Sequence, residues 1–81
     1  MEQEEKPYIA AVEISEYMKN RRREPHLTQQ AVADKAGIQL QQYRKFEGGK
    51  RNILKASFTV ACAVLNALDI DISDFYRTYK K

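Results

Sequence analysis

The stretch Leu27–Gly48, LTQQAVADKAGIQLQQYRKFEG, constrains the fold more than any other part of the chain. It has the pattern of two short helices joined by a tight turn. Thr28 is a suitable N-cap for the first helix, because its hydroxyl can accept a hydrogen bond from an otherwise unpaired amide of the first turn. Gly37 is suited to end that helix, since glycine adopts the left-handed conformation without a steric clash. The stretch therefore predicts two helices held at a fixed turn.

The apolar residues of this stretch fall on one face of each helix. In the first helix, Val32, Ala33 and Ala36 recur at helical spacing, and in the second, Tyr43 and Phe46 mark the core face. The opposite face of the second helix is mostly polar and basic, with Leu40, Gln41, Gln42, Arg44 and Lys45. Small residues in the first helix allow a close crossing, and a polar, basic outer face suits the major groove of DNA.

Many positions of the chain coincide, in order, with one known pattern. They are the Leu27-Thr28-Gln29 opening, Ala33, Gly37, Ile38, Tyr43, Phe46-Glu47-Gly48 and Lys50-Arg51, with Arg22 five residues before Leu27. This pattern resembles the helix-turn-helix of the phage-repressor and Cro-like regulators, the Xre group. The resemblance runs from about Ile14 to Tyr76. It implies a lambda-repressor-like DNA-binding fold with a helix-turn-helix unit at residues 28–47.

Helical patterns fill most of the remaining chain. We expect a helix over residues 8–23, a fourth helix from Phe58 to about Leu68 capped by Ser57, and a last helix opened by Asp71. Apolar residues wrap most of the fourth helix, so we expect it to be central and largely buried, with Cys62 as a small buried hydrophobe. The prediction is an all-α, compact five-helix bundle at residues 8–81, after a flexible acidic tail at residues 1–7.

One segment departs from the family's common form. Ile53-Leu54-Lys55 adds about three residues to the usual short link after the second helix of the unit. We expect Ile53 and Leu54 to enter the core or to form an extra turn.

The net charge of +3 conceals a strong asymmetry. Residues 1–18 carry a balance of −4, residues 19–55 a balance of +7, and residues 56–81 a balance of zero. Cations gathered around the two-helix unit attract polyanions and release counterions on binding phosphate. A merely solvated basic face is the alternative, and its coincidence with the helix-turn-helix favours nucleic acid.

The resemblance implies roles for individual residues. The family's base-reading positions correspond to Leu40, Gln41, Gln42, Arg44 and Lys45. Glutamine can pair with adenine, so Gln41 is the first candidate and Gln42 the second, while Arg44 or Lys45 could bind guanine. Leu40 could pack on a thymine methyl or on the core. Gln39 is a poor N-cap, so the contact register could shift by a residue.

Other residues are expected to hold the DNA backbone or the fold. The phosphate-contact candidates are Thr28, Gln29, Lys50, Arg51 and Lys55. Arg22 lies on the core side of its helix, and the family pairs an arginine at this position with the glutamate matched by Glu47. We therefore expect a partly buried Arg22–Glu47 ion pair that fixes how the first helix docks, in preference to a DNA contact by Arg22.

The sequence contains no constellation that predicts catalysis, a metal site or a cofactor. The chain has one cysteine and one histidine, which excludes an intramolecular disulfide and a cysteine-rich zinc site. No apolar run approaches the roughly 20 residues that span a bilayer. We expect a non-enzymatic, cytoplasmic protein.

The predicted function is binding to double-stranded DNA as a small transcriptional regulator, a repressor at an inverted-repeat operator. A weak homodimer through Phe75, Tyr76 and Tyr79 is the associated hypothesis. The alternative is a protein-interaction module, an antitoxin-like partner or adaptor, in which DNA binding is secondary or lost. The acidic first 18 residues could support that alternative as a partner-binding arm or as a competitor for the basic face.

Overall fold

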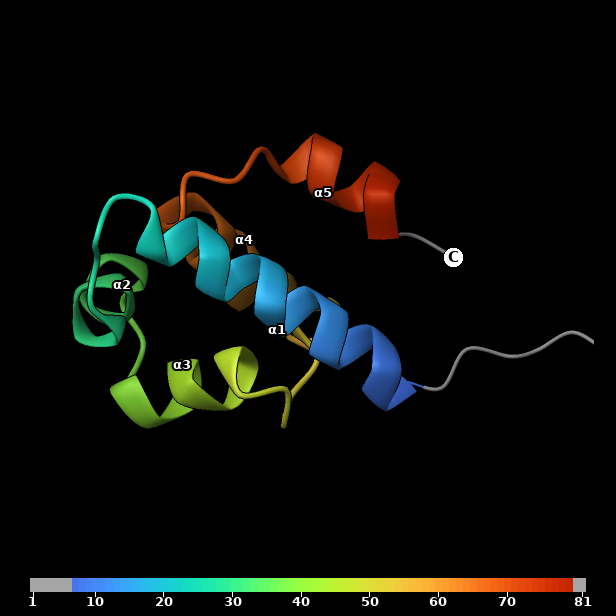
Figure 1. Cartoon of the computed structure of the whole chain (residues 1–81), viewed down its shortest axis with the longest axis horizontal. Coiled ribbons are helices and arrows are strands. Elements are labelled where there is room, and N and C mark those ends of the chain that lie inside the picture. The colour runs from blue at the N-terminus through green and yellow to red at the C-terminus, as the bar shows by residue number, and fades with distance from the viewer. Residues whose placement is uncertain (1–6, 80–81) are drawn as a thin grey trace, which may run out of the picture.

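The computed structural model describes residues 7–79 of the chain, with side chains from residue 13 onward, and every regular element in this range is a helix. Its elements are α1 (Pro7–Arg23), α2 (Gln29–Ala36), α3 (Leu40–Glu47), a short 3-10 turn η1 (Ile53–Lys55), α4 (Phe58–Ala67) and α5 (Ile72–Tyr79). The predicted all-α fold with five helices is confirmed. In Figure 1, α1 runs through the middle of the molecule, and α3 and α5 lie on opposite sides of it.

Side-chain caps explain where most helices begin. The Thr28 hydroxyl accepts from the Ala31 amide at 3.0 Å, and the Ser57 hydroxyl accepts from the Val60 amide at 3.2 Å. Gly37 ends α2 in the left-handed conformation, with φ of 74°. Gln39 precedes α3 without a side-chain cap, and α3 nevertheless begins at Leu40.

The core forms where α2 packs on α4 and where α1 and α2 pack on α3. Its fully buried side chains come from every element except α5: Ile14, Met18, Val32, Tyr43, Phe46, Ile53 and Val64. Ile53 belongs to the inserted segment, which forms the extra turn η1. Its neighbour Leu54 does not enter the core and is exposed. The insertion thus anchors the loop after α3 through one residue.

The prediction that α4 is buried around most of its circumference is wrong at its first turn. Phe58 is 81% exposed, because no other element covers the N-terminal end of α4 on that side. Cys62 is partly exposed instead of buried. The buried face of α4 is limited to its second half, with Val64, Leu65 and Ala67.

The first helix begins one residue earlier than expected. The acidic tail was expected to include residue 7, but α1 begins at Pro7. Residues 1–6, together with Lys80 and Lys81, lie outside the described residues.

Candidate nucleic-acid interface

The turn between α2 and α3 is built from local backbone hydrogen bonds. After Gly37 reverses the chain, the Ile38 amide donates to the Ala33 carbonyl at 3.0 Å, which closes the end of α2. Two residues later α3 begins, and it packs against α2. This arrangement fixes the direction of α3 from its first residue.

A buried carboxylate fixes the other end of α3. Glu47 is only 3% exposed, and Arg22 binds it with two hydrogen bonds, from Nε to Oε2 at 2.7 Å and from Nη2 to Oε1 at 2.9 Å. The Tyr43 hydroxyl donates to Oε2 at 2.6 Å, and Gln29 Nε2 donates to Oε1 at 2.8 Å. Arg22 Nη1 also donates to the Leu27 carbonyl at 2.8 Å. One carboxylate therefore ties α1, α2 and α3 together.

The electrostatics of this group follow from its hydrogen bonds. Burial alone would raise the pKa of Glu47, but the hydrogen bonds from Arg22, Tyr43 and Gln29 outweigh it and hold that pKa below its ordinary value. Burial and the bond to Glu47 raise the pKa of Tyr43. The hydrogen bonds that Arg22 donates to Glu47 raise the pKa of Arg22. Glu47 is thus ionised and Tyr43 neutral near pH 7, which is the state in which every bond of the group is satisfied.

The outer face of α3 contains the residues predicted to read bases. Gln41, Arg44 and Lys45 are exposed, and Leu40 and Gln42 are half-buried. On the inner face Tyr43, Phe46 and Glu47 are buried. Fixed inner residues thus present an outer face that carries amide and cationic donors toward solvent.

The predicted phosphate-contact residues have unequal surroundings. Thr28 is exposed but its hydroxyl oxygen already caps α2, and Gln29 uses one amide hydrogen for Glu47. Lys50, Arg51 and Lys55 are exposed. The guanidinium carbon of Arg51 lies 5.6 Å from the centroid of the Phe46 ring, and the Arg51 amide donates to the Lys45 carbonyl at 3.0 Å. Arg51 is therefore held beside the end of α3.

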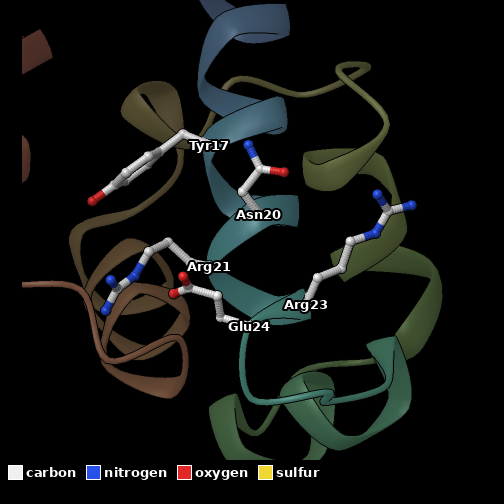
Figure 2. A pocket seen from close by; sticks show the side chains of 5 residues that line it. All are labelled: Tyr17, Asn20, Arg21, Arg23 and Glu24. Atoms are coloured by element: carbon white, nitrogen blue, oxygen red, sulfur yellow. The ribbon is translucent and has the colours of Figure 1, made fainter.

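The three arginines that end α1 serve different purposes. Arg21 Nη2 donates to the Asp69 carbonyl at 2.7 Å, which ties α1 to the connection between α4 and α5. Arg22 is the partner of Glu47, and Arg23 is exposed. Figure 2 shows Arg21 and Arg23 pointing to opposite sides of α1, around a hollow that Tyr17, Asn20 and Glu24 also line. Only Arg23 is left exposed to solvent.

Sequence reasoning missed part of the Glu47 group. The sequence predicts Tyr43 on the core face and Gln29 at a phosphate, and neither expectation includes a hydrogen bond to Glu47. The spacing of four residues between Tyr43 and Glu47 was an available signal, since such residues are neighbours on one helix face. The bond from Gln29 depends on how α2 meets α3, and no local pattern reveals it.

Within residues 7–79 no group of three histidine, cysteine, aspartate or glutamate residues is placed to hold a metal ion. In the same part of the chain, none of the helices combines the length and the apolar character needed to cross a membrane.

The site consists of a short helix capped by threonine, a glycine turn and a second helix with a buried inner face and a basic outer face. These features define the class of helix-turn-helix DNA-binding domains. A family model described as helix-turn-helix matches residues 18–75. The chain belongs to this family, the Xre or lambda-repressor-like helix-turn-helix proteins, and the predicted resemblance is confirmed. The family consists of DNA-binding regulatory domains that are typically non-enzymatic. Comparison of the chain with curated proteins and with solved structures finds no match.

Proposed function

We propose that this protein is a sequence-specific regulator that inserts α3 into the major groove of double-stranded DNA and represses transcription by occupying its operator. The observation that carries the proposal is the fixed position of α3. Glu47 holds its inner face through hydrogen bonds from three side chains, while Gln41, Arg44 and Lys45 remain exposed on its outer face.

The exposed residues have the chemistry that base recognition needs. Gln41 supplies an amide that matches adenine, and Arg44 and Lys45 supply donors that match guanine. Leu40 and Gln42, at the edge of this face, are the less exposed candidates. The fixed position of α3 favours binding, because its backbone has little conformational freedom left to lose.

Phosphate contacts would lie beside the C-terminal end of the inserted helix. Arg51 is held against Phe46 at the end of α3, and Lys50 and Lys55 flank it in sequence. Thr28 and the second amide hydrogen of Gln29 lie at the start of α2, which the bond from Gln29 to Glu47 holds beside the same end of α3, and helix amides there favour an anion. These contacts would set the register of α3 without reading sequence.

Selection of bound sequences from random duplex DNA at near-physiological salt tests the proposal. The wild-type protein is expected to enrich one motif, with specific binding at least about 10³-fold tighter than non-specific binding. Gln41→Ala is expected to lose the preference at one base position, at a cost of about 1–3 kcal/mol. Gln30→Ala is the matched control, because Gln30 is an exposed glutamine of α2 that bonds to Asp34.

The opposite outcome of this selection would refute the proposal. If no motif is enriched, and binding only weakens as salt rises, the basic face is a general polyanion surface. Sequence-specific regulation is then ruled out for this chain.

A further inference from the structure

The exposed cations that follow α3 have no acidic partner in the described part of the chain. Lys50 and Arg51 are both exposed, and among residues 13–79 no ion pair joins either of them to a carboxylate. The ion pairs that form in this range belong to other cations, Lys19, Arg22 and Arg77. The positive charge beside the end of α3 is therefore left uncompensated.

A group of acidic residues precedes α1. Residues 1–6, which lie outside the described residues, contain Glu2, Glu4 and Glu5 and a single base, Lys6. The segment that follows α3, residues 48–55, contains three bases and no acid. Opposite charges attract through water over about 10 Å at 0.1 M salt. The two segments are therefore complementary in charge, provided that they can meet.

The start of α1 and the chain after α3 are close enough for such a meeting. Arg22 binds Glu47 at the end of α3, and Pro7 begins α1 about four turns before Arg22, which is about 22 Å along the helix. Arg51 lies four residue steps after Glu47, and Glu2 lies five steps before Pro7. Together these steps cover up to about 32 Å. In Figure 1, α3 runs toward the end of the molecule at which α1 begins.

We propose that Glu2, Glu4 and Glu5 bind Lys50 and Arg51 in the free protein and thereby compete with DNA phosphates for these cations. This regulation rests on the proposed function, because it acts on the phosphate contacts beside the C-terminal end of α3. A segment tethered to its own binding surface acts at an effective concentration in the millimolar range. Ion pairs that would be weak between separate molecules are thus populated within one chain.

Arg51 is the best-prepared of the two targets. Its guanidinium carbon lies 5.6 Å from the centroid of the Phe46 ring, and its amide donates to the Lys45 carbonyl at 3.0 Å, so the residue is held in place. The donors at the edge of the guanidinium make no hydrogen bond to any residue among 13–79. A carboxylate and a phosphate bind this edge with the same geometry, so each excludes the other.

Binding to random duplex DNA tests the competition without depending on sequence recognition. A variant with Glu2, Glu4 and Glu5 changed to glutamine should bind with a Kd about 10-fold below that of the wild type at about 50 mM salt. The gain should shrink to about 2-fold at about 300 mM salt, because salt screens exposed ion pairs. Equal binding by the two proteins at low salt would overturn the proposal.

A charge-matched variant is the control. Glu13→Gln, Glu24→Gln and Asp69→Asn together remove three exposed carboxylates, none of which has an ion-pair partner among residues 13–79. This control changes the net charge as much as the first variant does, and it should bind random duplex within about 3-fold of the wild type. A gain as large as that of the first variant would mean that net charge alone sets the affinity, which contradicts the contact.

Repulsion between the acidic residues and DNA would also weaken binding, and the cations distinguish it from competition. In a protein with Lys50→Gln and Arg51→Gln, the target of the acidic residues is gone. Changing the three glutamates to glutamine in this background should give no further gain in affinity. A gain that persists in full would assign the effect to repulsion and overturn the proposal.

Carbodiimide coupling tests the contact in the absence of DNA. This reagent joins a carboxylate to a lysine amine without a spacer, so only groups in direct contact react. A link from residues 1–6 to Lys50 is expected, with a yield that is independent of protein concentration and falls at high salt. Such a link in a protein that does not bind DNA would support the contact and refute the DNA-binding proposal. No link in a protein that binds DNA would overturn the contact alone.

Discussion

The inner and outer faces of α3 both carry polar side chains, but only the inner ones have their hydrogen bonds completed within the protein. Glu47, buried on the inner face, accepts from Arg22, Tyr43 and Gln29. The side chains of Gln41, Arg44 and Lys45, exposed on the outer face, have no hydrogen-bond partner within the part of the chain that the structure describes. The comparison shows that burial decides whether a polar residue of this helix stabilises the fold or remains available to a ligand.

This difference predicts a separation of effects between the two faces. A buried polar group that loses its hydrogen-bond partner bears the full free-energy cost of its desolvation, whereas an exposed group remains hydrated. Substitutions on the inner face should therefore change the free energy of unfolding first. Substitutions on the outer face should change DNA affinity alone.

The largest expected effect is that of Glu47→Ala. It leaves the Arg22 guanidinium, whose side chain is only 14% exposed, without its anion and the Tyr43 hydroxyl without an acceptor. Removing one member of a buried pair costs about 3–5 kcal/mol. Urea unfolding measures the loss, with Gln41→Ala on the outer face as the control, expected within about 0.5 kcal/mol of wild type. A loss below about 1 kcal/mol in Glu47→Ala would contradict the anchoring role.

A smaller effect is expected from pH. Glu47 has a lower pKa in the folded than in the unfolded state, so its contribution to stability is present above the unfolded value of about 4.3 and is lost as pH falls through the folded value. Glu47→Gln cannot titrate at this position. The difference in unfolding free energy between wild type and Glu47→Gln should therefore shrink as pH falls from about 5 to 3.

The acid titration has an internal check. All other carboxylates are the same in the two proteins, so their contributions cancel in this difference. A difference that stays constant from neutral to acidic pH would show that Glu47 is not held ionised by its donors.

The parts of the fold that the sequence predicted are those set by local chemistry. The hydroxyl of Thr28 and the missing side chain of Gly37 decide the ends of α2 whatever surrounds them. The resemblance to the family predicted the pair of Arg22 and Glu47, which fixes how α1 docks. The exposure of Phe58 could not be predicted, since helical periodicity gives the apolar faces of α4 but not which of them another element covers.

The candidate site divides in the same way. That α3 has an outer face with Gln41, Arg44 and Lys45 follows from the spacing of Tyr43 and Phe46. Which base each residue contacts depends on how the whole domain sits on DNA, so the base-reading and phosphate roles stay predictions. The bond between Gln29 and Glu47 depends on the angle between two helices, which no residue spacing records.

The smallest expected effect tests the edge of the outer face, where Arg51 lies against Phe46. Arg51→Ala should weaken binding equally for specific and random duplexes and reduce the slope of log K against log salt by about 1, because one phosphate contact is lost. Arg51→Lys should keep the slope but lose part of the affinity, since an exposed cation–π contact contributes about 0.5–1 kcal/mol. Arg77→Ala is the control, because Arg77 pairs with Asp74 on α5, on the other side of α1 from α3 (Figure 1). An equal change of slope in Arg77→Ala would mean that net charge, and not a contact beside α3, accounts for the salt dependence.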